Sequence, residues 1–196
     1  STQGVSSAAS DVYKRQVNKG VTILGDSVAL RSKDQIESKI DNVYMDAVVS
    51  RNLSTINDLL KNYADSNALA KDVVIAGGVN EIDDYKGVIN KMIKNLPKGH
   101  HIIFVTPYNG SKSGSEAASL VQLRKYELEM AKKYDFVTVA DWYQVAKDNI
   151  SIWNGTDGVH FGSDSDSINR GAKLYTNTIK EAIAQADKSP VKGGKK

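Results

Sequence analysis

The chain has 196 residues, 40% of them hydrophobic, which is enough for one globular domain with a substantial core. It contains no cysteine, so disulfides, a thiol nucleophile and cysteine-based metal sites are excluded. No apolar run approaches the roughly 18 residues needed to cross a bilayer, so we expect this stretch of chain to be soluble. The formal net charge of +3 comes from the two ends, since the body between them holds more acidic than basic residues. A nucleic-acid partner is therefore not expected.

The two ends of the chain differ in composition from the body. Residues 1–19 are small and polar without any sustained period, and we predict a disordered linker or cloning-derived lead. Residues 188–196 are predicted to form a flexible basic tail. The remaining segment, 20–187, is predicted to be a single domain.

Strand and helix patterns alternate through this domain. The apolar run 21–24 predicts a strand that leads into Gly25-Asp26-Ser27 and then into a helix over 28–40. Further strands are predicted at 42–49, 72–76, 102–106 and 136–140, and further helices at about 53–63, 88–96, 117–133 and 169–186. Such alternation predicts an α/β fold, a three-layer α/β/α sandwich around a five-stranded parallel sheet of the flavodoxin-like kind.

Polar residues follow the ends of these predicted strands. Five of them fall at or just after a strand end, namely Ser27, Ser50, Asn80, Thr106 and Asp141. Ligands of parallel sheets bind at this carboxyl edge, and the N-terminus of a helix beside Ser27 would favour a developing negative charge. The alternative for Gly25-Asp26-Ser27 is an ordinary helix start, in which Asp26 or Ser27 serves as the N-cap.

Asp157-Gly158-Val159-His160 places a carboxylate three residues before an imidazole. Asp157 could accept the Nδ1 hydrogen of His160 and leave Nε2 free to take a proton from a serine. The alternative is that Asp157 caps a turn and His160 is an exposed loop residue. Together with Ser27 and Asn80, however, the pair supplies a nucleophile, an oriented base and an oxyanion donor, which are the parts that acyl transfer needs.

These segments resemble the SGNH (GDSL-type) hydrolase and acyltransferase superfamily. Leu24-Gly25-Asp26-Ser27-Val28 is similar to its first block, Gly78-Val79-Asn80 to its Gly-x-Asn block, and Asp157-Gly158-Val159-His160 to its terminal Asp-x-x-His block. Together with Asp46-Ala47-Val48-Val49-Ser50-Arg51-Asn52 and Asp141-Trp142-Tyr143, they are most similar to the extracellular C-terminal domain of Gram-positive peptidoglycan O-acetyltransferases. One departure is Ser50, where the superfamily usually has glycine.

The resemblance implies an O-acetyltransferase with Ser27 as nucleophile, His160 as general base and Asp157 as the residue that orients it. The oxyanion would be held by the amides of Ser27 and Ser50 and by the Asn80 side chain. An acetyl-serine would pass its acetyl group from a donor to the C6 hydroxyl of N-acetylmuramic acid in a peptidoglycan glycan strand. No cofactor or metal is implied. The domain would be a monomer at the extracellular face of the membrane, fused to an N-terminal membrane acyltransferase portion.

Other residues have two interpretations each. Arg51 could meet a substrate carboxylate or glycan substituent, or neutralise Asp46. Four aromatic or basic positions are candidate substrate-binding residues, namely Arg51, Tyr108, Trp142 and Trp153, and the alternative for the two tryptophans is packing beneath the His160 loop.

Three further positions are also considered as candidate functional residues. Asp141 is a second candidate for the triad acid, with capping of the turn after the last strand as the alternative. His100 and His101 fall at the opposite end of the sheet and are predicted to be surface histidines. No spacing typical of a zinc site occurs.

The sequence is also compatible with two other functions. One is a carbohydrate acetyl esterase or a lipase/thioesterase of the same superfamily, in which water takes the acyl group. The other is a glycan-binding module without catalysis, which would have no need for the serine, asparagine, aspartate and histidine together.

Overall fold

The computed structural model describes residues 18–80 and 83–194. The strands are β1 (Asn18–Gly25), β2 (Val43–Ala47), β3 (Ala70–Ala76), β4 (His101–Val105) and β5 (Val137–Ala140). The helices are α1 (Ser27–Arg31), α2 (Lys33–Lys39), α3 (Leu53–Asp65), α4 (Tyr85–Asn95), α5 (Gly114–Lys133), α6 (Trp142–Asp148), the 3₁₀ helix η1 (Ile150–Trp153) and α7 (Ser165–Ala186). None of these helices is long and apolar enough to span a membrane.

The five strands form one parallel sheet in the order β2-β1-β3-β4-β5. This confirms the predicted fold. The register pairs Gly25 at the end of β1 with Ala47 on one side and with Ala76 on the other. The loops that leave these three strands therefore start at the same level of the sheet.

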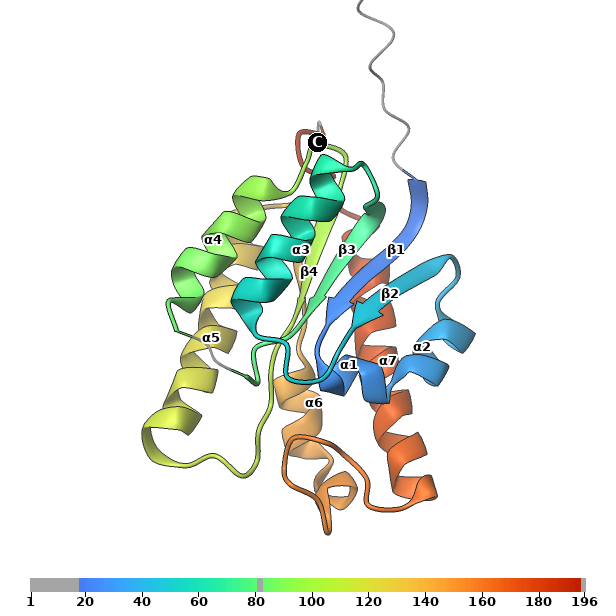
Figure 1. Ribbon diagram of the computed structural model, residues 1–196, viewed down its shortest axis with the longest axis vertical. Coiled ribbons are helices and arrows are strands. Elements are labelled where there is room, and N and C mark those ends of the chain that lie inside the picture. The colour runs from blue at the N-terminus through green and yellow to red at the C-terminus, as the bar shows by residue number, and fades with distance from the viewer. Residues whose placement is uncertain (1–17, 81–82, 195–196) are drawn as a thin grey trace, which may run out of the picture.

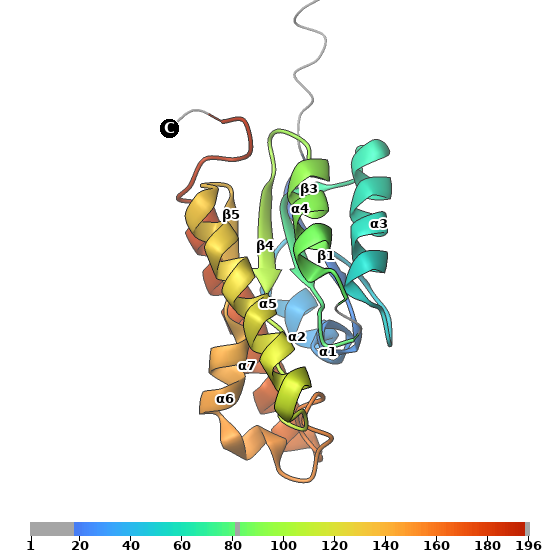
Figure 2. The ribbon, with the colours of Figure 1, turned by 90° about the vertical axis from the view of Figure 1, so that its left-hand side faces the viewer.

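Helices cover both faces of the sheet. Apolar residues of α3, α4 and α5 pack with Leu24, Val73 and Phe104 on one face. Residues of α1, α2, α6 and α7 pack with Ile23 and Val74 on the other face. Figure 1 shows α3 and α4 in front of the strands and α7 behind them, and Figure 2 shows the sheet between these layers.

Several helices differ from those predicted, and α4 and α5 each begin about three residues earlier than expected. The helix predicted over 28–40 is interrupted at Ser32, whose hydroxyl bonds the Val28 carbonyl (3.3 Å), a contact that bends helices. The connection after β5 contains α6 and η1, which the sequence pattern did not predict. The last helix begins at Ser165 rather than near 169, because Asp164 and Ser167 form a capping box.

Residues within 188–194 of the predicted flexible tail contact the body of the domain. Lys192 forms two backbone hydrogen bonds with the residues just before β4: its amide donates to the His100 carbonyl (2.9 Å), and its carbonyl accepts from the Gly99 amide (2.9 Å). Its ammonium group bonds the carbonyl oxygens of Ile93 (2.7 Å) and Leu96 (2.5 Å) at the end of α4, where a helix attracts positive charge. The start of the domain also shifts, because β1 begins at Asn18. The rest of the predicted N-terminal segment, 1–17, and residues 195–196 of the tail lie outside the described residues.

Candidate active site

Ser27 lies at the carboxyl edge of the sheet, as its position after β1 predicted. It is the first residue of α1, and Asp26 is the N-cap, whose side chain accepts from the Val28 amide (2.9 Å). The Asp26 amide in turn donates to the Ala76 carbonyl of β3 (3.0 Å), so the turn is fixed to the neighbouring strand. Asp26 thus has the capping role, and Ser27 is left free to point at another group.

A chain of hydrogen bonds joins Ser27, His160 and Asp157. The Ser27 Oγ lies 2.8 Å from His160 Nε2, and His160 Nδ1 lies 2.7 Å from Asp157 Oδ2. The other oxygen of Asp157 accepts from the amides of Val159 (2.9 Å) and His160 (2.7 Å). Burial alone would raise the pKa of Asp157, but the His160 ring and these two amides outweigh it and lower the pKa to about 2. The carboxylate therefore remains ionised wherever the imidazole can act as a base.

The loop that carries His160 is fastened to two other segments. Arg31, on the same helix as Ser27, donates to the carbonyls of Phe161 and Gly162 (2.7 Å each). On the other side, the Gly158 carbonyl accepts from Gly110 (2.8 Å), and a Cβ at Gly158 would lie 2.6 Å from the Ser111 amide. Arg31 thus fixes the serine helix to the histidine loop. No local pattern in the sequence indicates this role of Arg31, because its acceptors are carbonyls about 130 residues away.

The predicted oxyanion donors come from loops beside Ser27. Ser50 lies after β2 with a φ of 60°, in the left-handed region that glycine adopts most easily. A glycine, which the family resemblance leads us to expect at this position, would adopt this conformation without penalty. Asn80 follows β3, and its side-chain amide donates to the Arg51 carbonyl (3.0 Å). A carboxamide has two N–H donors, so one can hold the loop while the other serves a ligand.

Arg51 is an internal ion-pair partner rather than an open substrate contact. Its guanidinium bonds the Asp46 carboxylate (2.8 Å), and its side chain is 8% exposed. Of the two predicted roles, the structure supports neutralisation of Asp46, because β2 brings both residues to one end of the strand.

Of the two interpretations of Trp142, the structure supports packing beneath the His160 loop and not substrate contact. The residue is 2% exposed and packs against Phe161 and Tyr175, with ring centroids at 5.8 and 5.1 Å. An indole buries a large apolar area, and here it lies under the loop that carries His160. Trp153 is half-buried, donates its ring N–H to the Ala146 carbonyl (2.8 Å) and lies 4.9 Å from the ring of Tyr108. Trp153 and Tyr108 keep part of their surface exposed.

Asp141, the alternative triad acid, is bound elsewhere. Both of its oxygens are held by Arg124, at 2.8 and 2.6 Å, and one also accepts from Thr106 (3.0 Å). Burial raises the pKa of Asp141, but the bonds to Arg124 and Thr106 prevail and lower it. The structure therefore brings Asp157, and not Asp141, to His160.

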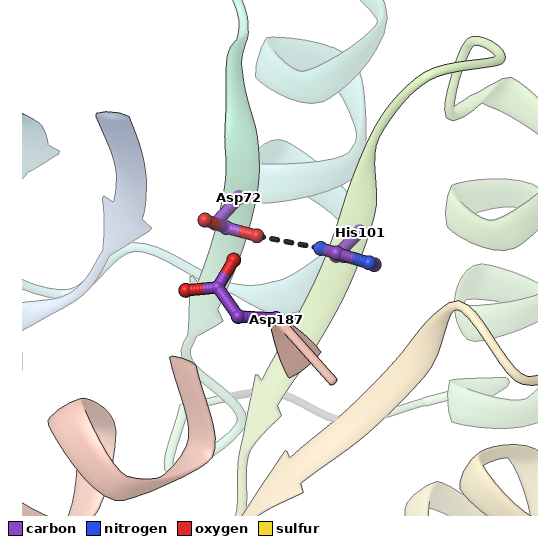
Figure 3. A group of neighbouring side chains, drawn as sticks. All are labelled: Asp72, His101 and Asp187. Atoms are coloured by element: carbon purple, nitrogen blue, oxygen red, sulfur yellow. Dashed lines mark hydrogen bonds and ion pairs between the residues drawn. The ribbon is translucent and has the colours of Figure 1, made fainter. Parts of the chain in front are cut away.

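The predicted surface histidines are buried. His100 is 6% and His101 is 1% exposed, because the segment after α7 covers the amino edge of the strands. His101 bonds Asp72 through Nδ1 (2.7 Å; Figure 3) and the Ser189 carbonyl through Nε2 (3.0 Å). Asp187, which lies beside them, pairs with Lys71 (2.5 Å). Burial lowers the pKa of His101, but its bonds to Asp72 and Ser189 outweigh this and raise it.

This group could in principle hold a cation, since ligand atoms of Asp72, His101 and Asp187 lie within 4.8 Å of one another. Each group, however, already has a partner within the protein. The cluster joins β3 and β4 to the end of α7, at the sheet edge opposite Ser27.

Comparison with known proteins identifies relatives of this chain. No family profile matches the chain. The C-terminal catalytic domain of peptidoglycan O-acetyltransferase A (OatA) of Streptococcus pneumoniae, solved with a methylsulfonyl adduct, is 44% identical; the match covers 90% of this chain and 98% of that domain, with a TM-score of 0.87. A GDSL-like lipase of Bacteroides thetaiotaomicron VPI-5482 shares the fold at 17% identity and a TM-score of 0.64, covering 86% of this chain and 89% of the lipase.

A longer relative is a Bacillus subtilis (strain 168) protein named as a candidate peptidoglycan O-acetyltransferase, YrhL. It is 27% identical over 165 residues, which are 84% of this chain but only 24% of that protein. The chain thus spans about a quarter of the length of this curated relative. From the near-complete match to the pneumococcal domain, the chain belongs to the family of C-terminal catalytic domains of peptidoglycan O-acetyltransferases, a group within the SGNH/GDSL-type enzymes.

Proposed function

We propose that this domain transfers an acetyl group, through an acetyl-Ser27 intermediate, to the C6 hydroxyl of N-acetylmuramic acid in peptidoglycan. The observation that carries the proposal is the continuous hydrogen-bonded line from Ser27 through His160 to Asp157 at the carboxyl edge of the sheet. The choice of acetyl as the transferred group and of a peptidoglycan strand as the acceptor is inferred from the family relationship.

In the first half-reaction, Ser27 is the nucleophile. His160 Nε2 takes the hydroxyl proton as Ser27 Oγ forms a bond to the carbonyl carbon of the donor, and the carbonyl electron pair moves onto oxygen. The amides of Ser27 and Ser50 and the Asn80 side chain stabilise this oxyanion. The carbonyl re-forms, the bond to the donor's leaving group breaks, and that group takes the proton from His160. Asp157 stabilises the intervening imidazolium.

The second half-reaction reverses these roles. His160 takes the proton of the muramic acid C6 hydroxyl, whose oxygen attacks the acetyl carbonyl of acetyl-Ser27. The same donors hold the second oxyanion. The Ser27 Oγ–carbon bond then breaks, and Ser27 recovers its proton from His160.

Transfer is tested by supplying an acetyl donor and a muramic-acid-containing oligosaccharide and following the sugar by mass spectrometry. We expect a gain of about 42 Da, the mass of an acetyl group replacing hydrogen, with p-nitrophenyl acetate as the probe donor. Ser27→Ala removes the nucleophile and is expected to give no acetylated sugar. A matched control is Lys71→Met, which breaks an ion pair at the opposite edge of the sheet and should acetylate like the parent. The proposal is wrong if acetylated sugar never forms, or if Ser27→Ala forms it at the parent's rate.

The second candidate function is an acetyl esterase, and one observation favours it. The side chains of His160 and Asp157 are 35% and 57% exposed, so water has access to the base. If water takes the acetyl group, acetate is released and no oligosaccharide gains mass. Measuring acetate and acetylated sugar in one reaction gives the partition between the two acceptors directly.

The setting follows from the same proposal. A peptidoglycan strand lies outside the membrane, so we place the domain on the cell-wall side, attached to an N-terminal membrane portion that delivers acetyl groups. The length of the Bacillus relative, about four times that of the matched segment, supports such an arrangement. Tyr108 and Trp153, with exposed ring surface near the His160 loop, are proposed to stack on the sugar. We further propose that the domain acts as a monomer, which size-exclusion chromatography tests.

A further inference from the structure

The three proposed oxyanion donors come from three different segments of the chain. Ser27 follows β1, Ser50 follows β2, and Asn80 follows β3. Donors stabilise a transition state only when their positions are fixed before the reaction, because moving them during it costs energy. Something must therefore hold the three segments together.

Arg51 contacts all three segments. Its Nη1 donates to the Gly25 carbonyl at the end of β1 (3.3 Å) and to the Asp46 carbonyl in β2 (2.7 Å). Its own carbonyl accepts from the Asn80 side chain after β3 (3.0 Å). Its backbone is bonded covalently to Ser50. In the described part of the chain, one residue thus touches or adjoins each element that carries an oxyanion donor.

The Arg51 side chain is itself fixed. Asp46 accepts from its Nη2 through Oδ1 (2.8 Å), and the other Asp46 oxygen accepts from the Tyr63 hydroxyl of α3 (3.0 Å). The guanidinium is planar with several donors in fixed directions, so it can bridge a carboxylate and two carbonyls at once. At 8% side-chain exposure it is shielded from solvent, which strengthens these bonds.

The conformation of Ser50 explains why such a clamp is needed. Its φ of 60° is unfavourable for a residue with a Cβ, and such a residue persists only when its surroundings enforce it. A glycine would adopt this conformation without penalty. With serine, the loop needs an external restraint, and the bonds of the next residue provide one.

We propose that Arg51 is a positioning residue for acyl transfer, which holds the Ser50 amide and the Asn80 carboxamide in place as oxyanion donors. This inference rests on the proposed function. It assigns Arg51 a role through other groups and not in substrate contact. The two roles differ in kinetics, because lost positioning lowers kcat, whereas lost substrate binding raises KM.

The first test compares Arg51→Met and Arg51→Lys with the parent in p-nitrophenyl acetate turnover. Removing one oxyanion donor costs roughly 100- to 1,000-fold in kcat, so loosening two of them through Arg51→Met should lower kcat by about 10- to 100-fold. KM should change less than about threefold, because Arg51 does not contact the substrate and ground-state binding is therefore unaffected. Arg51→Lys should recover part of the loss, because an ammonium can reach one acceptor but cannot bridge all of them. A raised KM at unchanged kcat would overturn the inference.

A double-mutant cycle tests the route through Asn80. Asn80→Ala removes one of the two groups that Arg51 is proposed to position. In that background, Arg51→Met can therefore displace only the Ser50 amide. We expect its effect on kcat in the Asn80→Ala background to be at least about threefold smaller than in the parent. Equal effects in both backgrounds would show that Arg51 acts elsewhere.

A structural measurement decides the inference independently of turnover. In Arg51→Met, amide hydrogen exchange should become faster over residues 47–52 and at 77–80, and in the control Lys71→Met it should not. Unchanged exchange in these segments would overturn the inference. If Arg51→Met fails to fold, Asp46→Asn weakens the same clamp with little change in volume and should accelerate the same exchange. A fully active Ser27→Ala would contradict the proposed function, while the exchange data would still decide the role of Arg51.

Discussion

Asp26→Asn is expected to stabilise the protein at neutral and alkaline pH. Asp26 is 1% exposed, directly before Ser27, and accepts the Val28 amide hydrogen at the start of α1. Burial raises the pKa of its carboxyl to about 6, although the amides of Val28 and Ala29 act in the opposite direction. Asparagine has the same shape, is an equally good N-cap and carries no charge.

The magnitude follows from the difference between the folded and unfolded pKa of Asp26. Between the ordinary value of 3.8 and the folded value of about 6, the folded state binds more protons than the unfolded state. The free energy of unfolding therefore falls as pH rises through this window, and the loss is complete above it. At 1.36 kcal/mol per pKa unit, about two units correspond to roughly 3 kcal/mol. An asparagine side chain does not titrate, so the variant should gain up to about 3 kcal/mol at pH 8 and well under about 1 kcal/mol at pH 4.

Urea-induced unfolding of parent and variant at the two pH values measures this directly. The matched control is Asp58→Asn, an exposed carboxyl on α3, which should give no pH-dependent gain. The reasoning about burial is refuted if Asp26→Asn changes stability equally at pH 4 and pH 8, or gives no gain at pH 8. We also expect lower activity, because the substitution removes a negative charge directly beside Ser27 and near His160.

Three more substitutions test how the parts of the fold support the site. Arg31→Met removes both bonds to the loop that carries His160, so kcat on p-nitrophenyl acetate should fall by about tenfold; an unchanged kcat would mean that the loop holds its place without Arg31. Lys192→Met removes the cation at the end of α4 and should cost about 1 kcal/mol in thermal unfolding, and an unaltered Tm would contradict this. Gly78→Ala should destabilise by about 1–3 kcal/mol in urea unfolding, because φ is 107° and the new Cβ would lie 2.8 Å from Leu123; full stability would show that the loop can relax.

The sequence predicted the sheet, the position of Ser27 and the Asp157–His160 pair because each of these depends on a local pattern. Runs such as 73–76 are apolar throughout, as expected for a strand covered on both faces, and each such run is followed by a helix. Ser27 follows directly from the end of β1, and Asp157 and His160 lie on one short loop whose own backbone fixes their distance. Their pairing across 133 residues was expected from the chemistry of acyl transfer and from the family resemblance, and not from any local pattern.

The features that the sequence could not predict depend on where side chains point and on segments, distant in the sequence, that cover a residue in the fold. Trp142 follows β5 as expected, but the ring turns into the core and not toward a ligand. His101 begins β4 at an edge that would be exposed without the segment after α7, and no local pattern shows that Ser189 lies on it. Arg51 stands beside Ser50 in the sequence, but its contact with Gly25 requires β2 to lie next to β1.

Strand register therefore determines the proposed oxyanion hole. Since Gly25 is level with Ala47 and with Ala76, Ser50 and Asn80 leave their strands beside Ser27. A slip of one residue would move a donor by about 3.3 Å and turn its neighbours to the opposite face. Of the three strands that precede the proposed donors, β2 is the one most exposed to such a slip, because it alone of the three lies at the edge of the sheet and pairs on one side only. The bonds from Arg51 to Asp46 and Gly25 tie this strand to β1 at the level where a slip would matter for catalysis.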